Sequence, residues 1–293
     1  MSTVTVPATA GSEARIARRE TARQLARSKT FIIGVFIVGF WIFCALFGPH
    51  IVPHDPQDQS FEPLLKPRGG HLFGTDALGR DVFSRVLVGA GDILKVAPLA
   101  TLLGIAGGTV VGLVTGYFRG LVDESISRIV DAWLALPVIV IAVTAIVALG
   151  SSTITLIIVI GVIFTPLVGR TVRAAVLAER GLDYVQAARL RGERAPYVLF
   201  VEILPNIMGP IIVEATVRLG YAIFAVAGLT FLGFGVQPPS PDWALQISDS
   251  YGLLNDTAHQ GNYWTVLFPG AAVASLVVGV NLIADGISRV LER

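Results

Sequence analysis

The sequence predicts an all-α membrane protein with about six transmembrane helices. Of its 293 residues 53% are hydrophobic and only 15% are charged, whereas an ordinary soluble domain carries about 25% charge. Several uncharged or nearly uncharged runs each approach the ~20 residues that a helix needs to cross a bilayer. Helices satisfy every backbone polar group within such isolated runs, and the alternating pattern of a β-barrel is absent from the sequence.

The elements follow in order along the chain. We expect a basic cytoplasmic segment over 1–29, a first transmembrane helix over 30–49, an extracytoplasmic segment over 50–92 and a transmembrane core over 93–293. Within the extracytoplasmic segment, 81–90 is expected to form a short amphipathic helix at the membrane surface. The apolar runs that predict spanning helices are 31–48, 94–118, 132–150, 153–169, 207–236 and 263–282.

Basic residues predict the orientation of these helices. Cytoplasmic segments of membrane proteins carry an excess of Lys and Arg. Here 1–29 and 170–194 are rich in arginine. The segments on the other side of the membrane hold only Lys66, Arg68, Arg80, Arg85 and Lys95. Both termini are therefore expected in the cytoplasm.

The second apolar run contains a regular series of glycines. They recur every four residues and would form one smooth stripe on a helix, where a neighbouring backbone can approach closely. The stripe predicts tight helix packing and says nothing about a substrate. Its members are Gly104, Gly108, Gly112 and Gly116.

A long polar segment separates the fourth and fifth apolar runs. Residues 183–191 suit a short helix, Gly192 interrupts it, and Pro196 fits the first turn of a second helix. We call this helix–glycine–helix segment the knob. A knob that projects from a membrane protein indicates that a partner protein docks on it, although a solvated connecting loop is the simpler interpretation.

This segment resembles the EAA loop found in membrane subunits of ABC importers, and it covers about 176–205. The matching residues are Gln186, Ala187, Ala188, Gly192, Ile203, Leu204 and Pro205, and the predicted coupling loop also includes Asp183 and Tyr184. The resemblance implies a coupling helix that inserts into a cytoplasmic ATPase. Gln186 stands where the family usually has Glu, so hydrogen bonding can persist there but an ion pair cannot.

Further motifs resemble the DppC/OppC type of permease in importers of dipeptides, oligopeptides and nickel. They are LFGTD at 72–76, LGRDVFSR at 78–85, TFLGFGVQPP at 230–239, PDW at 241–243 and NLIADG at 281–286. The resemblance implies a multi-pass protein of the bacterial cytoplasmic membrane that forms half of a peptide translocation pathway. It also implies as partners a second homologous permease, two ATPase subunits, an extracytoplasmic substrate-binding protein and membrane lipid, with no nucleic acid.

The chain itself is expected to be non-catalytic and to bind no cofactor. It has no phosphate-binding loop of the GxxxxGK[ST] form, so ATP and Mg would be bound by the partner ATPases. An ATP-independent secondary transporter or channel is the alternative function. That class commonly carries several deep ionisable residues and internal repeats, which this sequence lacks. Within the importer interpretation, nickel or another small solute remains an alternative to peptide.

Polar residues near or inside the apolar runs have two interpretations each. Glu214 and Arg218 lie four apart in the fifth run and suit a structural ion pair or a lining of the substrate path. Asp242 and Trp243 follow two prolines in an outside loop, where they suit membrane anchoring or docking of the binding protein.

A histidine-containing turn follows the first apolar run. Its metal-type side chains are His50, His54, Asp55 and Asp58. Histidines in a proline-rich turn are more typical of a solvated surface, so no metal site is expected.

Overall fold

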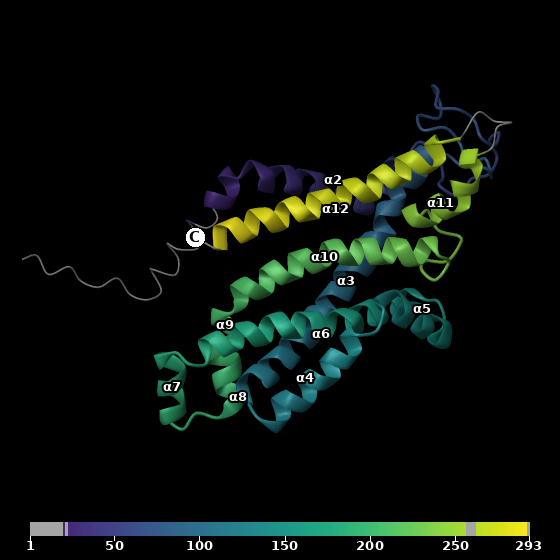
Figure 1. Cartoon of the computed structure of the whole chain (residues 1–293). Coiled ribbons are helices and arrows are strands. Elements are labelled where there is room, and N and C mark those ends of the chain that lie inside the picture. The colour runs from purple at the N-terminus through teal and green to yellow at the C-terminus, as the bar shows by residue number, and fades with distance from the viewer. Residues whose placement is uncertain (1–19, 21–22, 256–261, 292–293) are drawn as a thin grey trace, which may run out of the picture.

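A computed structural model describes residues 20, 23–255 and 262–291, and Figure 1 shows an elongated bundle of helices. The N-terminal segment predicted over 1–29 therefore lies mostly outside the described residues. The described part contains no strand, only two isolated bridges. Its helices are α2 (Lys29–Ile51), α3 (Val82–Tyr117), α4 (Leu121–Leu134), α5 (Val138–Leu149), α6 (Thr153–Glu179), α7 (Asp183–Leu190), α8 (Ala195–Tyr197), η1 (Val198–Ile203), α9 (Leu204–Asn206), α10 (Met208–Phe231), α11 (Trp243–Ser250), η2 (Tyr251–Asn255) and α12 (Trp264–Leu291).

Five of these helices are long and apolar enough to cross a membrane, namely α2, α3, α6, α10 and α12. A sixth crossing comes from α4 and α5 if that bent pair counts as one span. The all-α membrane architecture predicted from composition is thus confirmed. The core lies where α3, α6, α10 and α12 meet, and it continues to the outer side chains Trp243 and Trp264.

The predicted third span is not one straight helix. The chain bends by 89° between α4 and α5. Pro137 lies at this break as the N-cap of α5, and a proline cannot continue the hydrogen bonding of the preceding helix. With its 12 residues, α5 is about 18 Å long and too short to cross ~30 Å of hydrocarbon alone.

The α3 glycine stripe lies against α6. A Cβ atom added to any of the four glycines would come within 2.4–2.7 Å of a heavy atom of α6. Gly104 faces Phe164 and Gly116 faces Val176, so later residues of one helix meet later residues of the other. The two helices therefore run parallel. The connection formed by α4 and α5 must carry the chain from the end of α3 back to the level at which α6 begins.

The first and last spanning helices, α2 and α12, pack antiparallel to each other. Gly34 of α2 lies against Ile283 of α12, whereas Gly279 of α12 lies against Ile37 of α2. The start of α2 and the end of α12 consequently lie at one end of the bundle, which is also the end that carries α7 (Figure 1). The cytoplasmic placement of the two termini stays a prediction.

The expected surface helix over 81–90 is instead the first part of α3. Asp81 caps this 36-residue helix by accepting from the backbone N–H of Ser84 at 2.8 Å. Val82, Val86 and Ala90 are buried rather than lying on a membrane surface. Their apolar periodicity reflects packing within the protein, because they share the hydrophobic core with Trp41 of α2 and with Trp243.

Candidate functional site

The segment between α6 and α10 forms a knob at the shared end of the bundle (Figure 1). It contains α7, a turn at Gly192, and the continuous run of α8, η1 and α9. Gly192 has a φ of +79°, a conformation that glycine adopts without steric cost. Its N–H bonds to the carbonyl of Arg189, and the next N–H, that of Glu193, bonds to Ala188. This is a Schellman ending of α7, and the predicted helix–glycine–helix arrangement is confirmed.

The inner face of α7 packs into an apolar cluster that it shares with transmembrane helices. Val185 and Ala188 are fully buried. They share one apolar cluster with residues of α3, α6, η1 and α10, namely Leu113, Val168, Val172, Val176, Val198, Leu199, Ile203, Ile207 and Ile211. The inner face of α7 is therefore part of one close-packed interior with α3 and α6.

The outer face of α7 is exposed over most of its length. Asp183, Gln186, Ala187 and Leu190 are exposed, and Leu190 is 89% exposed. Gln186 donates from Nε2 to the Gly181 carbonyl at 3.2 Å. An exposed leucine on a short projecting helix is typical of a helix that inserts into a groove of a partner.

Polar contacts hold the base of the knob. The Tyr184 hydroxyl donates to Glu179 Oε2 at 2.6 Å, and burial together with this carboxylate raises the pKa of Tyr184 to about 12. Arg191 donates to Glu202 Oε1 at 3.2 Å across the Gly192 turn. Leu204 is half-buried at the end of the second helix, while Pro205 is exposed. The knob is therefore a defined structure rather than a loose loop.

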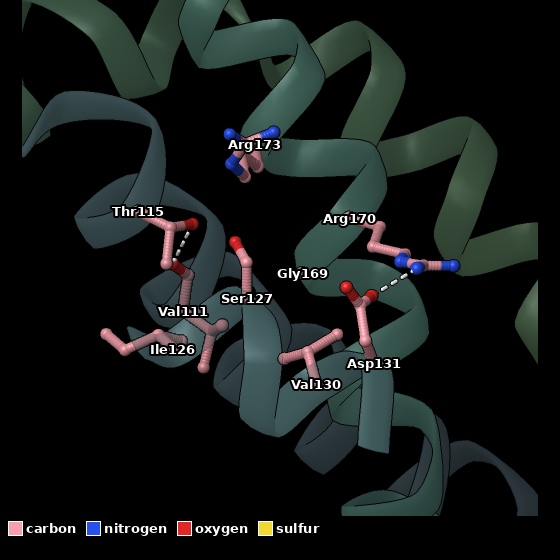
Figure 2. A pocket seen from close by; sticks show the side chains of 9 residues that line it. All are labelled: Val111, Thr115, Ile126, Ser127, Val130, Asp131, Gly169, Arg170 and Arg173. Carbon is pink, nitrogen blue, oxygen red and sulfur yellow. Dashed lines mark hydrogen bonds and ion pairs between the residues drawn. The ribbon is translucent and has the colours of Figure 1, made fainter. Parts of the chain in front are cut away.

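A polar pocket of about 320 Å³ lies between α3, α4 and α6 (Figure 2). Thr115, Ser127 and Asp131 line it from α3 and α4, and Arg170 and Arg173 line it from α6. Arg170 pairs with Asp131. Sequence reasoning missed this pocket, although the two acidic residues 123 and 131 on an amphipathic helix were a signal.

A second ion pair ties α4 to α6 beside this pocket. Arg173 donates from both Nε and Nη2 to the two carboxylate oxygens of Asp123, each at 2.7 Å. Because α4 buries no residue of its own, such bidentate contacts are prominent among the interactions that hold it against the bundle.

Removal of this pair should loosen α4. We expect Asp123→Asn and Arg173→Gln each to lower thermal stability in detergent, and a double-mutant cycle to give a coupling of about 1 kcal/mol because the pair is partly solvated. Arg128→Gln is the control, since its pair with Glu124 is largely exposed. Strict additivity of the two single effects would contradict the prediction.

The intramembrane residues Glu214 and Arg218 form an ion pair. Arg218 lies 2.6 Å from Glu214 Oε1, and the two side chains are 17% and 13% exposed. The guanidinium also lies 5.9 Å from the ring centre of Phe164 and 5.6 Å from that of Tyr221. The structural interpretation of this pair therefore has direct support in the geometry.

Asp242 and Trp243 are fully buried at the opposite end of the bundle. Asp242 caps α11 by accepting from the N–H groups of Ala244 and Leu245. Trp243 donates from Nε1 to the Val86 carbonyl at 2.7 Å. Enclosed side chains do not contact a docking protein directly, so these residues shape the outer surface from below.

The buried Asp242 carboxyl should make stability depend on pH. Burial raises the pKa of Asp242 to about 6, with Asp92 adding to the increase and two backbone N–H donors opposing it. A folded state that holds its proton more tightly loses stability as pH rises from about 4 to about 6, by at most about 3 kcal/mol. Thermal unfolding across this range should show the decrease.

Asp242→Asn keeps a side-chain oxygen that can cap α11, and it should remove the pH dependence of thermal stability between about pH 4 and about pH 6. Asp249→Asn, which changes a partly exposed carboxylate of the same helix, should keep the wild-type trend. Equal pH profiles for wild type and Asp242→Asn would show that Asp242 does not cause the dependence.

The histidine turn is organised differently from the cluster that the sequence suggested. His54 lies beside His71 and Asp81, not in a group with His50, Asp55 and Asp58. His71 Nδ1 lies 2.9 Å from Asp81 Oδ1, and His54 Nε2 lies 3.1 Å from the Gly70 carbonyl. These hydrogen bonds fasten the outer segment to the start of α3, and the absence of a metal there stays a prediction.

Two family descriptions match the chain. "Binding-protein-dependent transport system inner membrane component" matches residues 108–293, and "N-terminal TM domain of oligopeptide transport permease C" matches residues 18–67. The first match covers the glycine stripe beyond Gly104 together with the whole knob.

Curated relatives match along most of their length. The dipeptide transport system permease protein DppC of Alkalihalophilus pseudofirmus is 38% identical over 94% of this chain and 89% of the relative. The di/tripeptide transport system permease protein DppC of Pseudomonas aeruginosa is 35% identical over 94% and 91%. A glutathione transport system permease protein, GsiD of Pectobacterium atrosepticum, is 30% identical over 98% and 95%.

A solved structure shares the fold. An inward-facing form of the MetNI methionine ABC transporter matches with a TM-score of 0.57 and 20% identity, over 71% of this chain and 97% of that chain.

Proposed function

Because the chain belongs to the family of binding-protein-dependent transport system inner membrane components, we propose that it is one of two permease subunits of an importer that carries di- or oligopeptides. It is a multi-pass protein of the inner membrane and an ABC importer permease. Peptide as the substrate is supported by relatives named for dipeptides and di/tripeptides. A secondary transporter or channel is not favoured by these relationships.

The observation that carries the proposal is the two-faced helix α7. Its outer residues Gln186 and Leu190 are exposed, and in the proposal they enter a groove of a cytoplasmic ATPase together with Asp183 and Ala187. Its inner residues pack into the cluster that contains α3 and α6. ATP binding that closes two ATPases would thus be transmitted to the parallel pair α3 and α6.

The remaining partners follow from the same proposal. A second homologous permease would complete the translocation pathway, and an extracytoplasmic binding protein would deliver substrate at the end formed by the outer segment and α11. ATP and Mg would be bound and hydrolysed by the ATPases. The chain itself would contribute positioning and movement without a chemical step.

Co-purification tests the assembly. The tagged chain is isolated from native membranes in mild detergent, and the accompanying subunits and their ATPase activity are measured. We expect a second permease, ATPase subunits, and hydrolysis stimulated by the binding protein and peptide. A chain that purifies alone and transports only with an ion gradient would overturn the proposal.

A matched pair of variants tests the role of α7. Leu190→Asp places a charge on the exposed apolar position and should reduce recovery of the ATPase at least tenfold, while the second permease is retained. Leu254→Asp changes a leucine that is also exposed, in η2 at the opposite end, and should leave ATPase recovery unchanged. Equal recovery with both variants would contradict docking through α7.

A further inference from the structure

A cationic pocket lies between α7 and the ends of α3 and α6. It has a volume of about 370 Å³ and is lined by the arginines Arg119, Arg180 and Arg189 together with Leu177, Gln186 and Leu190. Among the residues that the structure describes, no carboxylate lines it. The pocket is distinct from the polar pocket of Figure 2, where each arginine faces an aspartate.

The three arginines are incompletely paired. Arg180 donates from Nη1 to the carbonyls of Gly116 and Tyr117 at 3.2 Å each, which caps the end of α3. Arg189 lies 4.5 Å from the ring centre of Tyr117, and its Nε is buried without a hydrogen-bond partner in the described part of the chain. Arg119 makes no ion pair with any described residue. Each guanidinium therefore keeps donors for a further group.

No ion pair among the described residues neutralises these three arginines. The carboxylate of Asp123, on which Arg119 has a weaker Coulombic effect than Arg173, is already bound by Arg173. Burial, and then the positive charges of Arg119 and Arg189, lower the pKa of Arg180. An arginine guanidinium is a cationic donor that matches phosphate geometry. The C-terminal end of α3 offers only about half a negative charge. A buried, unpaired guanidinium donor is costly, so an anion would stabilise the arrangement.

We propose that this pocket binds a phosphate group, supplied by the headgroup of an anionic phospholipid. Guanidinium groups match phosphate oxygens in bidentate geometry. Basic pockets between helices at the cytoplasmic side of a membrane are typical sites for such headgroups. Leu177, at the end of α6, gives the pocket an apolar edge suited to the lipid backbone. The proposal rests on the proposed function, because that function places the knob in the cytoplasm.

Such a ligand would act on the knob directly. Gln186, Arg189 and Leu190 belong to α7, Arg119 follows α3, and Leu177 with Arg180 belongs to the end of α6. A bound headgroup would bridge all three segments. The lipid would therefore strengthen the attachment of the coupling helix to the helices that it has to move.

Lipid binding can be measured by native mass spectrometry on the chain purified with its accompanying subunits. Dioleoyl phosphatidylglycerol should bind at least fivefold more tightly than dioleoyl phosphatidylcholine. Arg119→Gln is the primary variant, since Arg119 holds no structural hydrogen bond, and it should remove most of this preference. Arg194→Gln changes an exposed arginine of the same segment outside the pocket and should preserve it.

The two sources of phosphate are separated by competition. Inorganic phosphate at millimolar concentration should weaken phosphatidylglycerol binding in the wild type only slightly if the lipid is the natural ligand. Full displacement would assign the site to free phosphate and overturn the lipid assignment. Loss of the ATPase from Arg119→Gln with unchanged lipid binding would assign the pocket to an acidic group of the ATPase and also overturn it.

An importer that assembles and hydrolyses ATP but binds the two lipids equally would overturn the lipid site alone. Absence of any ATPase partner, with the lipid preference intact, would instead count against the proposed function. The two failures are therefore distinguishable in one preparation.

Discussion

Replacement of Gly192 by valine is expected to lower peptide uptake by the assembled importer about tenfold or more. Gly192 has a φ of +79° and no heavy atom within 4 Å of an added Cβ, so the effect comes from the backbone and not from a clash. Left-handed conformation costs an L-residue about 1–2 kcal/mol, and a β-branched side chain is less tolerant still. A shift of 1.4 kcal/mol changes an equilibrium tenfold.

The turn at Gly192 decides where the two helices of the knob point. Its hydrogen bonds to Arg189 and Ala188 end α7, and the Arg191–Glu202 contact spans it. A distorted turn would redirect α7 relative to the proposed ATPase groove while the transmembrane helices stay folded. We therefore expect normal amounts of protein in the membrane, basal ATP hydrolysis, and loss of its stimulation by binding protein and peptide.

Two control variants separate the backbone effect from bulk. Gly192→Asn should keep most activity, because asparagine tolerates the left-handed region. Gly181→Val adds the same side chain at another open glycine of the segment, where no positive φ occurs, and should transport normally. Wild-type uptake by Gly192→Val would remove the coupling role from this turn.

The features that could be predicted from the sequence are local and periodic. The spanning helices follow from uninterrupted apolar runs, and the knob follows from Gly192 and Pro196, whose effects act within a few residues. The glycine stripe predicted a close helix contact but not the identity of α6 as the partner. The spacing of the glycines shows which face of the helix is free of side chains, but it does not show which helix packs on that face.

Features that depend on distant residues were not predictable. The Asp123–Arg173 pair joins positions 50 apart in the sequence, and it forms only because α4 packs alongside both α3 and α6. The bend at Pro137 could have been anticipated from proline chemistry, but the apolar run around it masked that signal. His71 and Asp81 meet because the outer segment folds back on α3.

The second large effect is expected from the glycine stripe. Gly108→Leu should abolish recovery of folded protein, because an added Cβ at this position would lie 2.4 Å from the Val168 Cβ and 2.8 Å from the Thr165 carbonyl oxygen. Overpacking of a filled core typically costs 1–3 kcal/mol or more. Here the obstacle includes backbone, so α3 and α6 would have to separate along their contact.

Recovery and thermal stability are best followed by size-exclusion chromatography of the detergent-solubilised chain. Gly228→Leu is the matched control, since Gly228 lies in α10 and a Cβ added to it would have no heavy atom within 4 Å, and it should give normal yield. A partial rescue is available at Gly116, where the nearest atoms belong to Val176. Gly116→Ala alone should destabilise, and Val176→Gly added to it should restore part of the loss. If Gly108→Leu and Gly228→Leu were equally stable, the α3–α6 contact would not be a determinant of the fold.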